Sequence, residues 1–181
     1  MKLSVLVPAY NEEAGLATIL RRIAAVPVDK EIIVVNDCSS DRTGAILDGA
    51  VVGDRIPGLR VIHHRTNRGK GAAIRTALQA ASGDAVIIQD ADLEYDPQDY
   101  PALLAPILSG EAQVVYGVRN LDAQKLLFRL GNRALTWLTN LLYGVQLHDM
   151  ETCYKVMTID IARRLDIESN GFDLETEITA K

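Results

Sequence analysis

The sequence predicts an α/β fold in which helices flank a mostly parallel sheet. Two observations lead to this fold class. Short runs rich in Val, Ile and Leu alternate along the chain with longer stretches of helical period, and the runs show little polar alternation. Strands buried on both faces of a parallel sheet have this continuous apolar pattern. Strand–helix alternation at this spacing is typical of a doubly wound sheet.

Five apolar runs are expected to form the strands. Each is expected to be a parallel strand that is buried on both faces. The runs are Leu3–Val7, Glu31–Val35, Leu59–His63, Ala85–Gln89 and Gln113–Gly117. Because ligands of such sheets bind outside the carboxyl ends of the strands, the residues that follow each run are the candidates for function.

Four stretches of helical period lie between these runs. Two of them are preceded by residues that favour a helix start, namely the segment 39–41 (Ser-Ser-Asp) and Asp96 ahead of Pro97. The expected helices are Glu12–Ala25, Ser40–Ala50, Gly71–Ala81 and Gln98–Leu108.

The alternation stops after about Arg119. A long helical stretch, Asp122–Tyr143, is followed by a short strand candidate, Thr152–Met157, and by two helical pieces. The last of these, Asp173–Lys181, stops in mid-pattern at the end of the chain. The 181 residues are therefore expected to form a single domain, 1–181, that is truncated at its C-terminal end.

Composition and charge narrow the class of protein. Hydrophobic residues make up 48% of the chain, and 19 Lys and Arg against 24 Asp and Glu give a net charge of −5. This balance argues against nucleic acid as a partner, because nucleic-acid binders cluster basic residues. Cys38 and Cys153 lie far apart without metal-ligand spacing, and neither a signal peptide nor a membrane-spanning apolar run is visible. We therefore expect a cytoplasmic protein with reduced thiols.

Acidic residues crowd the segment that follows the fourth predicted strand. Residues 84–99 hold six acids and no Lys or Arg. Asp90 and Asp92 are two positions apart, so at an extended strand end both carboxylates point to the same side. Such a pair suits Mg²⁺ or Mn²⁺, with substrate phosphates completing the coordination shell. The alternative is that Asp92 or Asp96 only caps a turn or a helix.

The glycine-containing loop Arg68–Gly71 has two interpretations. Its backbone N–H groups could meet a phosphate at the next helix start, or the loop could be a plain glycine turn. Its sequence matches neither GxxxxGK[ST] nor GxGxxG, which disfavours a P-loop ATPase and a dinucleotide dehydrogenase. His63 and His64 are expected to end a strand rather than to bind a metal. The sequence also lacks a GxSxG elbow and a cysteine with an adjacent base, so covalent nucleophilic catalysis is unsupported.

The long helical stretch after Arg119 is basic and apolar. Lys125, Arg129 and Arg133 are spaced by four residues, which places them on one helical face. Several leucines and Trp137 flank them. This pattern predicts a membrane-surface element, and the alternative is a helix packed on the sheet whose charges are simply solvated.

Seven motifs, taken in chain order, resemble those of one enzyme family. They look like the successive motifs of family-2 inverting glycosyltransferases, nearest the branch of dolichyl-phosphate mannose synthases and polyprenyl-phosphate sugar transferases. The resemblance implies a glycosyltransferase A-type fold, which is Rossmann-like, and a nucleoside diphosphate sugar donor. The motifs are VPAYNEE (Val7–Glu13), VVNDCSSDRT (Val34–Thr43), NRGKGAA (Asn67–Ala73), GDAVIIQDADLEYDP (Gly83–Pro97), YGVR (Tyr116–Arg119), HDMETCYKV (His148–Val156) and GFDLETEITAK (Gly171–Lys181).

The resemblance implies how the donor nucleoside is bound. Pro8, Tyr10 and Glu12 match positions that line the nucleoside pocket. Asp37 matches the residue that hydrogen-bonds the base, and Lys70 is counted with these donor-binding residues.

The resemblance also implies a metal site. Asp90 would approach the ribose and the metal ion, and Asp92 would bind the metal together with the diphosphate. Glu94 stands where many relatives have Gln, and its carboxylate is a third candidate ligand. The expected ion is Mg²⁺ or Mn²⁺.

Three residues are candidate catalytic residues on the acceptor side. Arg119 and Arg133 match arginines that the lipid-phosphate branch uses against the acceptor phosphate or the diphosphate. Asp149 matches the acidic position near the sugar and the acceptor. The following TCYK (152–155) departs from the pattern common in the mannose synthases, so the sugar stays open.

The predicted reaction is transfer of a hexose from a donor of GDP-mannose or UDP-glucose type to a polyprenyl (dolichyl or undecaprenyl) phosphate. One alternative is a soluble transferase that acts on a sugar hydroxyl in polysaccharide or cell-envelope synthesis, with Asp149 as general base. Another is a non-catalytic module that binds a nucleotide sugar. The expected setting is the cytoplasm, at the inner face of the membrane, and a homo-oligomer is a further candidate arrangement.

Overall fold

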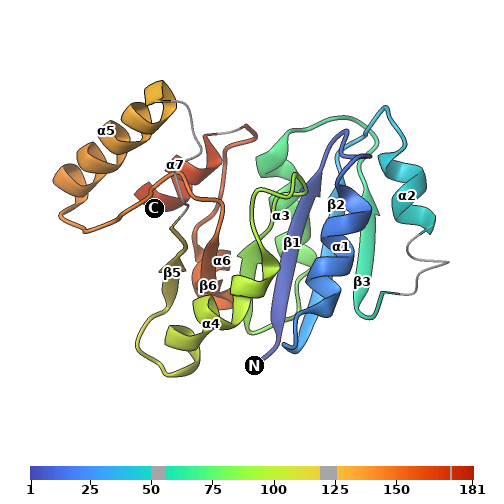
Figure 1. The fold of residues 1–181 in the computed structure, drawn as a ribbon, viewed down its shortest axis with the longest axis horizontal. Coiled ribbons are helices and arrows are strands. Elements are labelled where there is room, and N and C mark those ends of the chain that lie inside the picture. The colour runs from blue at the N-terminus through green and yellow to red at the C-terminus, as the bar shows by residue number, and fades with distance from the viewer. Residues whose placement is uncertain (50–55, 119–125, 172) are drawn as a thin grey trace.

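The computed structural model describes residues 1–49, 56–118, 126–171 and 173–181. One six-stranded sheet carries helices on both faces (Figure 1). Its strands are β1 (Leu3–Ala9), β2 (Lys30–Asn36), β3 (Leu59–His63), β4 (Ala85–Ile88), β5 (Val114–Tyr116) and β6 (Lys155–Thr158). The helices are α1 (Leu16–Ala25), α2 (Thr43–Gly49), α3 (Lys70–Ala80), α4 (Tyr100–Leu108), α5 (Leu126–Tyr143), α6 (Ile159–Arg164), α7 (Leu174–Ala180) and the 3₁₀ turn η2 (Pro97–Asp99).

The strand order is β3-β2-β1-β4-β6-β5. The strands β1 to β4 are mutually parallel, with β1 central between β2 and β4, while β6 runs antiparallel to both β4 and β5. This order brings the carboxyl ends of β1, β2, β3 and β4 to one edge, where the sequence predicts the ligand site.

Two of the predicted strands differ from the expectation of parallel strands buried on both faces. The expected strand Gln113–Gly117 is reduced to β5, which pairs antiparallel with β6 at the sheet edge, and its first residue is exposed. β3 is parallel as expected, but it is the opposite edge strand and is only partly buried. An edge strand has one neighbour and less cover, so an apolar run alone does not distinguish it from a central strand.

Most helix predictions are confirmed in place but not at their ends. α1 begins at Leu16 rather than Glu12, because Glu12 accepts backbone hydrogen bonds in a turn ahead of the helix. Asp96 caps η2 through the N–H of Gln98, as the sequence predicts. The predicted strand Thr152–Met157 instead runs over Lys155–Thr158, because the backbone before it turns around the side chain of Lys155.

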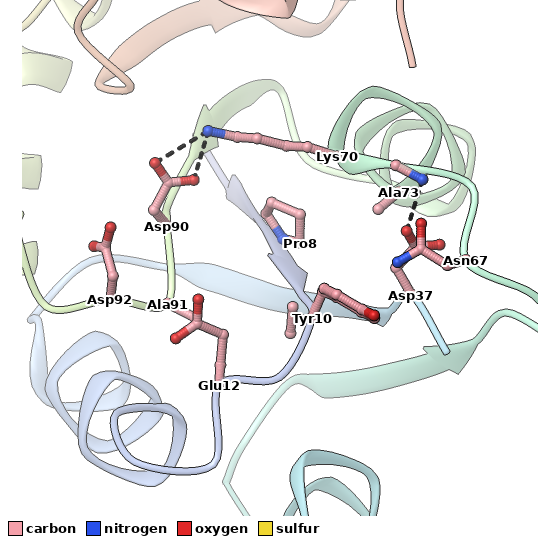
Figure 2. Close-up of a pocket in the computed structure, with 12 residues that line it drawn as sticks. Pro8, Tyr10, Glu12, Asp37, Asn67, Lys70, Ala73, Asp90, Ala91 and Asp92 are labelled. Atoms are coloured by element: carbon pink, nitrogen blue, oxygen red, sulfur yellow. Dashed lines mark hydrogen bonds and ion pairs between the residues drawn. The ribbon is translucent and has the colours of Figure 1, made fainter. Parts of the chain in front are cut away.

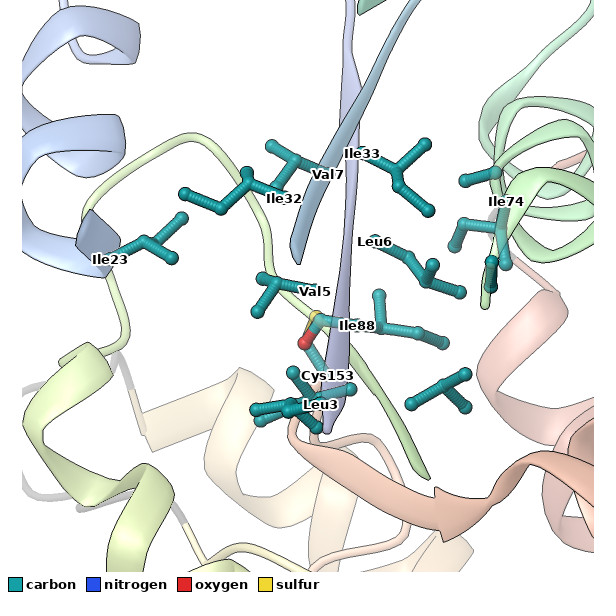
Figure 3. Close-up of a cluster of buried hydrophobic side chains, with 14 of the residues drawn as sticks. Leu3, Val5, Leu6, Val7, Ile23, Ile32, Ile33, Ile74, Ile88 and Cys153 are labelled. Atoms are coloured by element: carbon teal, nitrogen blue, oxygen red, sulfur yellow. The ribbon is translucent and has the colours of Figure 1, made fainter. Parts of the chain in front are cut away.

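The hydrophobic core fills both sides of the sheet (Figure 3). Val5 and Val7 of β1 point toward α1, where Ile23 packs, whereas Leu6 points toward α3 and Ile74. All five side chains are almost completely buried. Burial of an aliphatic side chain of this size stabilises the fold by about 1.5–3 kcal/mol, so the four parallel strands rest on a well-packed base.

The helix α5 lies apart from this core (Figure 1). Among the side chains of α5 that the structure describes, from residue 131 onward, the buried ones are polar: Asn132, Thr136 and Thr139 form a stripe spaced by four and three residues. The exposed side chains described there are mostly apolar, among them Leu135, Trp137, Leu138, Leu141 and Leu142, alongside Arg133. A helix of a soluble domain normally buries its apolar face, so α5 has the opposite polarity. No helix in the described part of the chain is long and apolar enough to cross a membrane.

Candidate active site

A pocket of about 370 Å³ opens at the carboxyl edge of β1, β2 and β4 (Figure 2). This size suits a small ligand. Six residues named from the sequence line it, namely Pro8, Tyr10, Glu12, Asp37, Lys70 and Asp90, and Asp92 lines it as well. These seven residues therefore lie together, whereas Glu94 is not part of the lining.

Tight turns lead the chain out of three strands at this edge. Asn11 after β1, Cys38 after β2 and Leu93 after β4 have positive φ angles of 57°, 60° and 68°. Non-glycine residues rarely adopt this conformation, which costs of order 1–3 kcal/mol at each position. Strain of this kind concentrates at functional sites, where the rest of the fold holds it in place.

Asp37 organises the base of the pocket on the β2 side. Its carboxylate is buried and accepts hydrogen bonds from the N–H groups of Arg68 and Gly69, at 2.9 and 2.7 Å. His64, which follows β3, approaches the same carboxylate through Nδ1 at 2.7 Å and contacts Thr76 through Nε2. Asp37 therefore fixes the loop ahead of α3, in addition to its predicted contact with the base of the donor.

The loop Arg68–Gly71 favours the glycine-turn interpretation over a phosphate-binding loop. Three of its four amides have partners, because Arg68 and Gly69 donate to Asp37 and Gly71 donates to the carbonyl of Asn170. Gly69 has a φ of 88°, and a Cβ there would lie 2.0 Å from the same carbonyl. Only glycine fits this position. The loop thus presents the side chain of Lys70, rather than its own amides, to the pocket.

Lys70 is shared between two carboxylates. Its ammonium lies 2.8 Å from Asp90 Oδ1 and 2.8 Å from Glu175 Oε1, which comes from α7. Burial alone would lower the pKa of the Lys70 ammonium, but the adjacent carboxylates raise it, so the lysine is fully charged. Figure 2 shows the lysine reaching across the pocket to Asp90. A partly buried cation in this position can meet an anionic ligand.

The opposite side of the pocket is acidic. Glu12, Asp90 and Asp92 face it, although β4 ends at Ile88 and the two aspartates lie on the turn that follows. Partial burial raises the pKa of the Glu12 carboxyl, and the negative charges of Asp92 and Asp90 raise it further. Hard oxygen donors that repel one another in this way fit a divalent cation that takes its other ligands from substrate and water.

The structure does not bring the three predicted metal ligands together. Among the described residues, no group of three or more His, Cys, Asp or Glu side chains is arranged to hold a metal ion. Asp92 instead accepts a hydrogen bond from the N–H of Glu94 across a turn, which is the capping role left open by the sequence. The Asp90–Asp92 pair fits a cation, and the participation of Glu94 stays a prediction.

Asp149 lies in a turn held between α5 and β6. Its carboxylate is buried and accepts a hydrogen bond from Asn132 Nδ2 at 3.0 Å. The next N–H, that of Met150, donates to Thr136 Oγ1 at 3.2 Å. The polar stripe of α5 is thus buried because it holds this turn. Asp149 is not among the residues that line the pocket beside Asp90.

The candidate basic residues are only partly within the described residues. Arg133 lies on α5 and is exposed. Arg119, Lys125 and the side chain of Arg129 lie outside the part of the chain that the structure describes. Their predicted roles toward phosphate groups stay predictions.

Comparison with known proteins decides the family. The family model described as glycosyl transferase family 2 matches residues 4–159, which cover β1 to β6 and the whole pocket. The chain belongs to glycosyl transferase family 2. The resemblance of the sequence motifs to this family is confirmed.

Two curated relatives show the range of this family-2 similarity. The low-salt glycan biosynthesis hexosyltransferase Agl6 of Haloferax volcanii is 31% identical over 97% of this chain and 43% of its own length. The undecaprenyl-phosphate mannosyltransferase of Micrococcus luteus is 28% identical over 99% of this chain and 76% of its own length. The chain spans less than half of the first relative and about three quarters of the second.

A solved structure confirms the glycosyltransferase fold. Glucosyl-3-phosphoglycerate synthase from Mycobacterium tuberculosis, crystallised with Mn²⁺, UDP and phosphoglyceric acid, aligns with a TM-score of 0.76 and 25% identity. The alignment covers 98% of this chain and 62% of that protein. The mostly parallel sheet flanked by helices is therefore a glycosyltransferase A-type sheet, as the sequence predicts.

Sequence reasoning missed four residues of this family-2 site. His64 was assigned only to a strand end, although it follows β3 at the same edge as Asp37 and contacts it. Glu175 and Asn132 lie 105 and 17 residues along the chain from Lys70 and Asp149, and Lys155 lies five residues from Met150, whose carbonyl it binds. In the sequence, these residues are visible only as polar residues inside an apolar or helical pattern. This pattern does not indicate which residue each of them contacts.

Proposed function

We propose that the chain is the catalytic domain of a glycosyltransferase that moves a sugar from a nucleoside diphosphate donor to a polyprenyl phosphate. The observation that carries the proposal is the pocket at the carboxyl edge, where one partly buried lysine faces a group of carboxylates. The family membership and the acceptor named for the Micrococcus luteus relative support the substrate class.

The pocket offers separate surfaces for the parts of the donor. Tyr10 is half exposed at the pocket wall and can stack on a base, beside Pro8 and the buried Asp37. Lys70 lies between this wall and Asp90, where its ammonium can hold an anionic diphosphate. A nucleoside diphosphate therefore fits with its base toward β2 and its phosphates toward β4.

Asp90 and Asp92 are the residues that would hold Mg²⁺ or Mn²⁺ at the diphosphate. When bound, such an ion supplies positive charge that stabilises the departing nucleoside diphosphate. The presence of Mn²⁺ with UDP in the Mycobacterium tuberculosis synthase supports this assignment. Lys70 adds a fixed positive charge from the protein, which strengthens as the leaving group becomes more negative.

The acceptor determines what Asp149 does. A phosphate monoester has its second pKa near 6 and is already mostly dianionic at neutral pH, so its attack on the anomeric carbon needs no general base. The buried Asp149 then positions groups around the sugar and the acceptor. Arg133 is exposed on α5, one residue after Asn132, and can meet the acceptor phosphate. Arg119 is proposed to bind the same phosphate.

The helix α5 is proposed as the part of the chain that meets the membrane carrying the lipid acceptor. Trp137 and Leu141 are 65% and 64% exposed, and they belong to the apolar face opposite the stripe that holds Asp149. Apolar side chains with a Trp among them insert at the headgroup boundary of a bilayer. The solvated-helix alternative explains the exposed Arg133 but not the exposed leucines.

Calorimetric titration of UDP and GDP, each with and without Mn²⁺, tests the donor site. One nucleotide is expected to bind in the micromolar range, with affinity at least about tenfold higher in the presence of the metal. Equal affinity for both nucleotides with no metal effect would contradict the assignment of Asp90 and Asp92.

A further inference from the structure

Lys155 is a completely buried lysine that the proposed chemistry does not use. It stands at the start of β6 with 0% of its surface exposed. Its ammonium donates hydrogen bonds to the carbonyls of Met150, at 3.0 Å, and of Thr152. The ring of Tyr116 on β5 lies on another side, with its centroid 5.1 Å from the nitrogen. The chain after Asp149 therefore wraps around this ammonium.

We propose that Lys155 is a positioning residue that fixes the turn carrying Asp149 at the acceptor side of the active site. Met150 and Thr152 are the first and third residues after Asp149, so both carbonyls belong to that turn. The proposal rests on the proposed function, because it gives a catalytic consequence to the position of Asp149. Lys155 does not touch the pocket and acts only through the turn.

The turn is held from two directions. On the side of α5, Asn132 donates to the Asp149 carboxylate and Thr136 accepts from the N–H of Met150. On the side of the sheet, Lys155 binds the two carbonyls. The N–H of Met150 is bonded to α5 and its carbonyl is bonded to Lys155, so each of the two peptide groups that flank Met150 is held by one of these bonds. The Asp149 side chain is thereby tied to the rigid sheet.

A row of charged side chains extends from the donor pocket toward this turn. Asp90 pairs with Lys70, and Lys70 pairs with Glu175. Among the carboxylates that raise the pKa of Lys155, Glu175 has the largest effect, ahead of Glu151 and Asp149. Negative and positive groups thus alternate from the donor pocket to the acceptor-side turn. Lys155 carries the charge that hydrogen-bonds the backbone of the turn.

The buried ammonium carries an energetic penalty that an apolar residue would avoid. Burial lowers the pKa of Lys155 to about 8, although the surrounding carboxylates of Glu175, Glu151 and Asp149 act in the opposite direction. Methionine has a similar length and volume without any donor. A methionine there would fill the space but leave both carbonyls of the turn unpaired. What the lysine adds is therefore the hydrogen bonds to the turn.

Lys155→Met, Lys155→Arg and a matched control test the proposal. The control is Lys30→Met, because Lys30 also donates to carbonyls, those of Val26 and Ala24, but lies at the amino end of β2 away from the pocket. Sugar transfer to polyprenyl phosphate gives kcat and the donor KM, and calorimetry gives the affinity for the nucleotide. Hydrogen–deuterium exchange of residues 148–154 reports the turn itself.

Lys155→Met is expected to lower kcat by up to about tenfold, the loss expected for Asp149→Asn on this acceptor, with an unchanged donor KM and nucleotide affinity, because it displaces the Asp149 side chain. Exchange at the amides of Met150 and Cys153 is expected to rise about tenfold or more, and Lys155→Arg is expected to restore part of kcat. Lys30→Met is expected to leave kcat unchanged. A wild-type kcat in Lys155→Met, or an equal loss of nucleotide affinity, would overturn the proposal.

Two further readouts keep the proposal separate from folding and from the proposed function. If Lys155→Met does not fold, Asn132→Ala releases the same turn from the α5 side. It is expected to lower kcat with an unchanged donor KM. A wild-type kcat in Asn132→Ala would overturn the proposal. The exchange measurement needs no substrate. If the wild-type protein has no transferase activity, the proposed function is refuted. Faster exchange confined to 148–154 in Lys155→Met would still support the role of Lys155 in fixing the turn. Unchanged exchange in Lys155→Met would refute that role.

Discussion

The donor pocket and the α5 region are built on opposite principles. The pocket rests on strands whose side chains are apolar and buried on both faces, and its polar groups appear only where the strands end. The helix α5 buries a polar stripe and exposes leucines and Trp137. The described lining of the pocket follows the ends of these strands, whereas α5 presents an apolar face that suits a lipid environment. We infer from this difference that the donor is bound on the sheet side and that the acceptor is proposed to be met on the α5 side.

The largest expected effect comes from removing a carboxylate on the acidic side of the pocket. Asp92→Asn is expected to lower kcat about 1000-fold and to abolish the effect of Mn²⁺ on nucleotide affinity, because the leaving group loses its stabilisation. Steady-state kinetics and calorimetry measure both. Asp99→Asn, in the same acidic stretch but outside the pocket lining, is the control and is expected to keep wild-type values.

Two leucine variants test whether the sheet core and the apolar face of α5 differ in how they contribute to the free energy of unfolding. Leu6→Ala in the core is expected to lower the free energy of unfolding by about 2–5 kcal/mol, because it leaves a cavity in the sheet. Leu141→Ala on α5 is expected to change it by less than about 0.5 kcal/mol. Urea unfolding gives both values. A large destabilisation by Leu141→Ala would show that the apolar face of α5 packs within the chain.

The same Leu141→Ala variant is expected to weaken binding to vesicles of phosphatidylcholine and phosphatidylglycerol about tenfold, because it removes exposed apolar surface. Sedimentation with the vesicles measures this binding. Unchanged vesicle binding would remove the membrane role proposed for α5.

The pH dependence of the free energy of unfolding tests the burial of Lys155, which lies between the sheet and the turn that α5 holds. The pKa of Lys155 is about 8 in the folded chain and near 10.5 when unfolded, so between these values the unfolded chain binds more protons. The free energy of unfolding is therefore expected to rise between pH 8 and 10, by up to about 3 kcal/mol from this group. Lys155→Met is expected to lack this rise. Equal slopes in both proteins would contradict the burial of a charged lysine.

Asp149→Asn has the smallest expected effect and separates the two kinds of acceptor. With a polyprenyl phosphate acceptor, kcat is expected to fall only about tenfold, because the dianion needs no general base. With a sugar hydroxyl acceptor the loss is expected to be nearly complete. Transfer assays on both acceptors measure the difference. Near-complete loss on the phosphate acceptor would show that Asp149 does more than position groups.

Much of the donor side could be predicted from the sequence. Buried parallel strands are continuous apolar runs, so their carboxyl ends are visible in the sequence, and Asp37, Asp90 and Asp92 follow such runs directly. The antiparallel β5 and β6 could not be predicted in the same way. Direction and edge position depend on pairing between distant segments, and a short apolar run carries no information on either.

The acceptor side was predicted only through motif resemblance. Asp149 was named in that way, but the residues that hold it are polar positions on α5 and a lysine inside a strand. Each has a plain local explanation as a solvent-facing residue. Their roles emerge only when the turn is packed between α5 and β6, and the same holds for Glu175 and its contact with Lys70.

The most direct test of the central claim is transfer of a labelled sugar into the lipid phase. The protein is incubated with UDP- and GDP-linked hexoses, Mn²⁺ and undecaprenyl or dolichyl phosphate, and the label is extracted into organic solvent. The account predicts a lipid-linked sugar from one donor, formed with the wild-type protein and not with Asp92→Asn. Label that enters only a polyprenol without its phosphate, or no lipid-linked label from any donor, would contradict it.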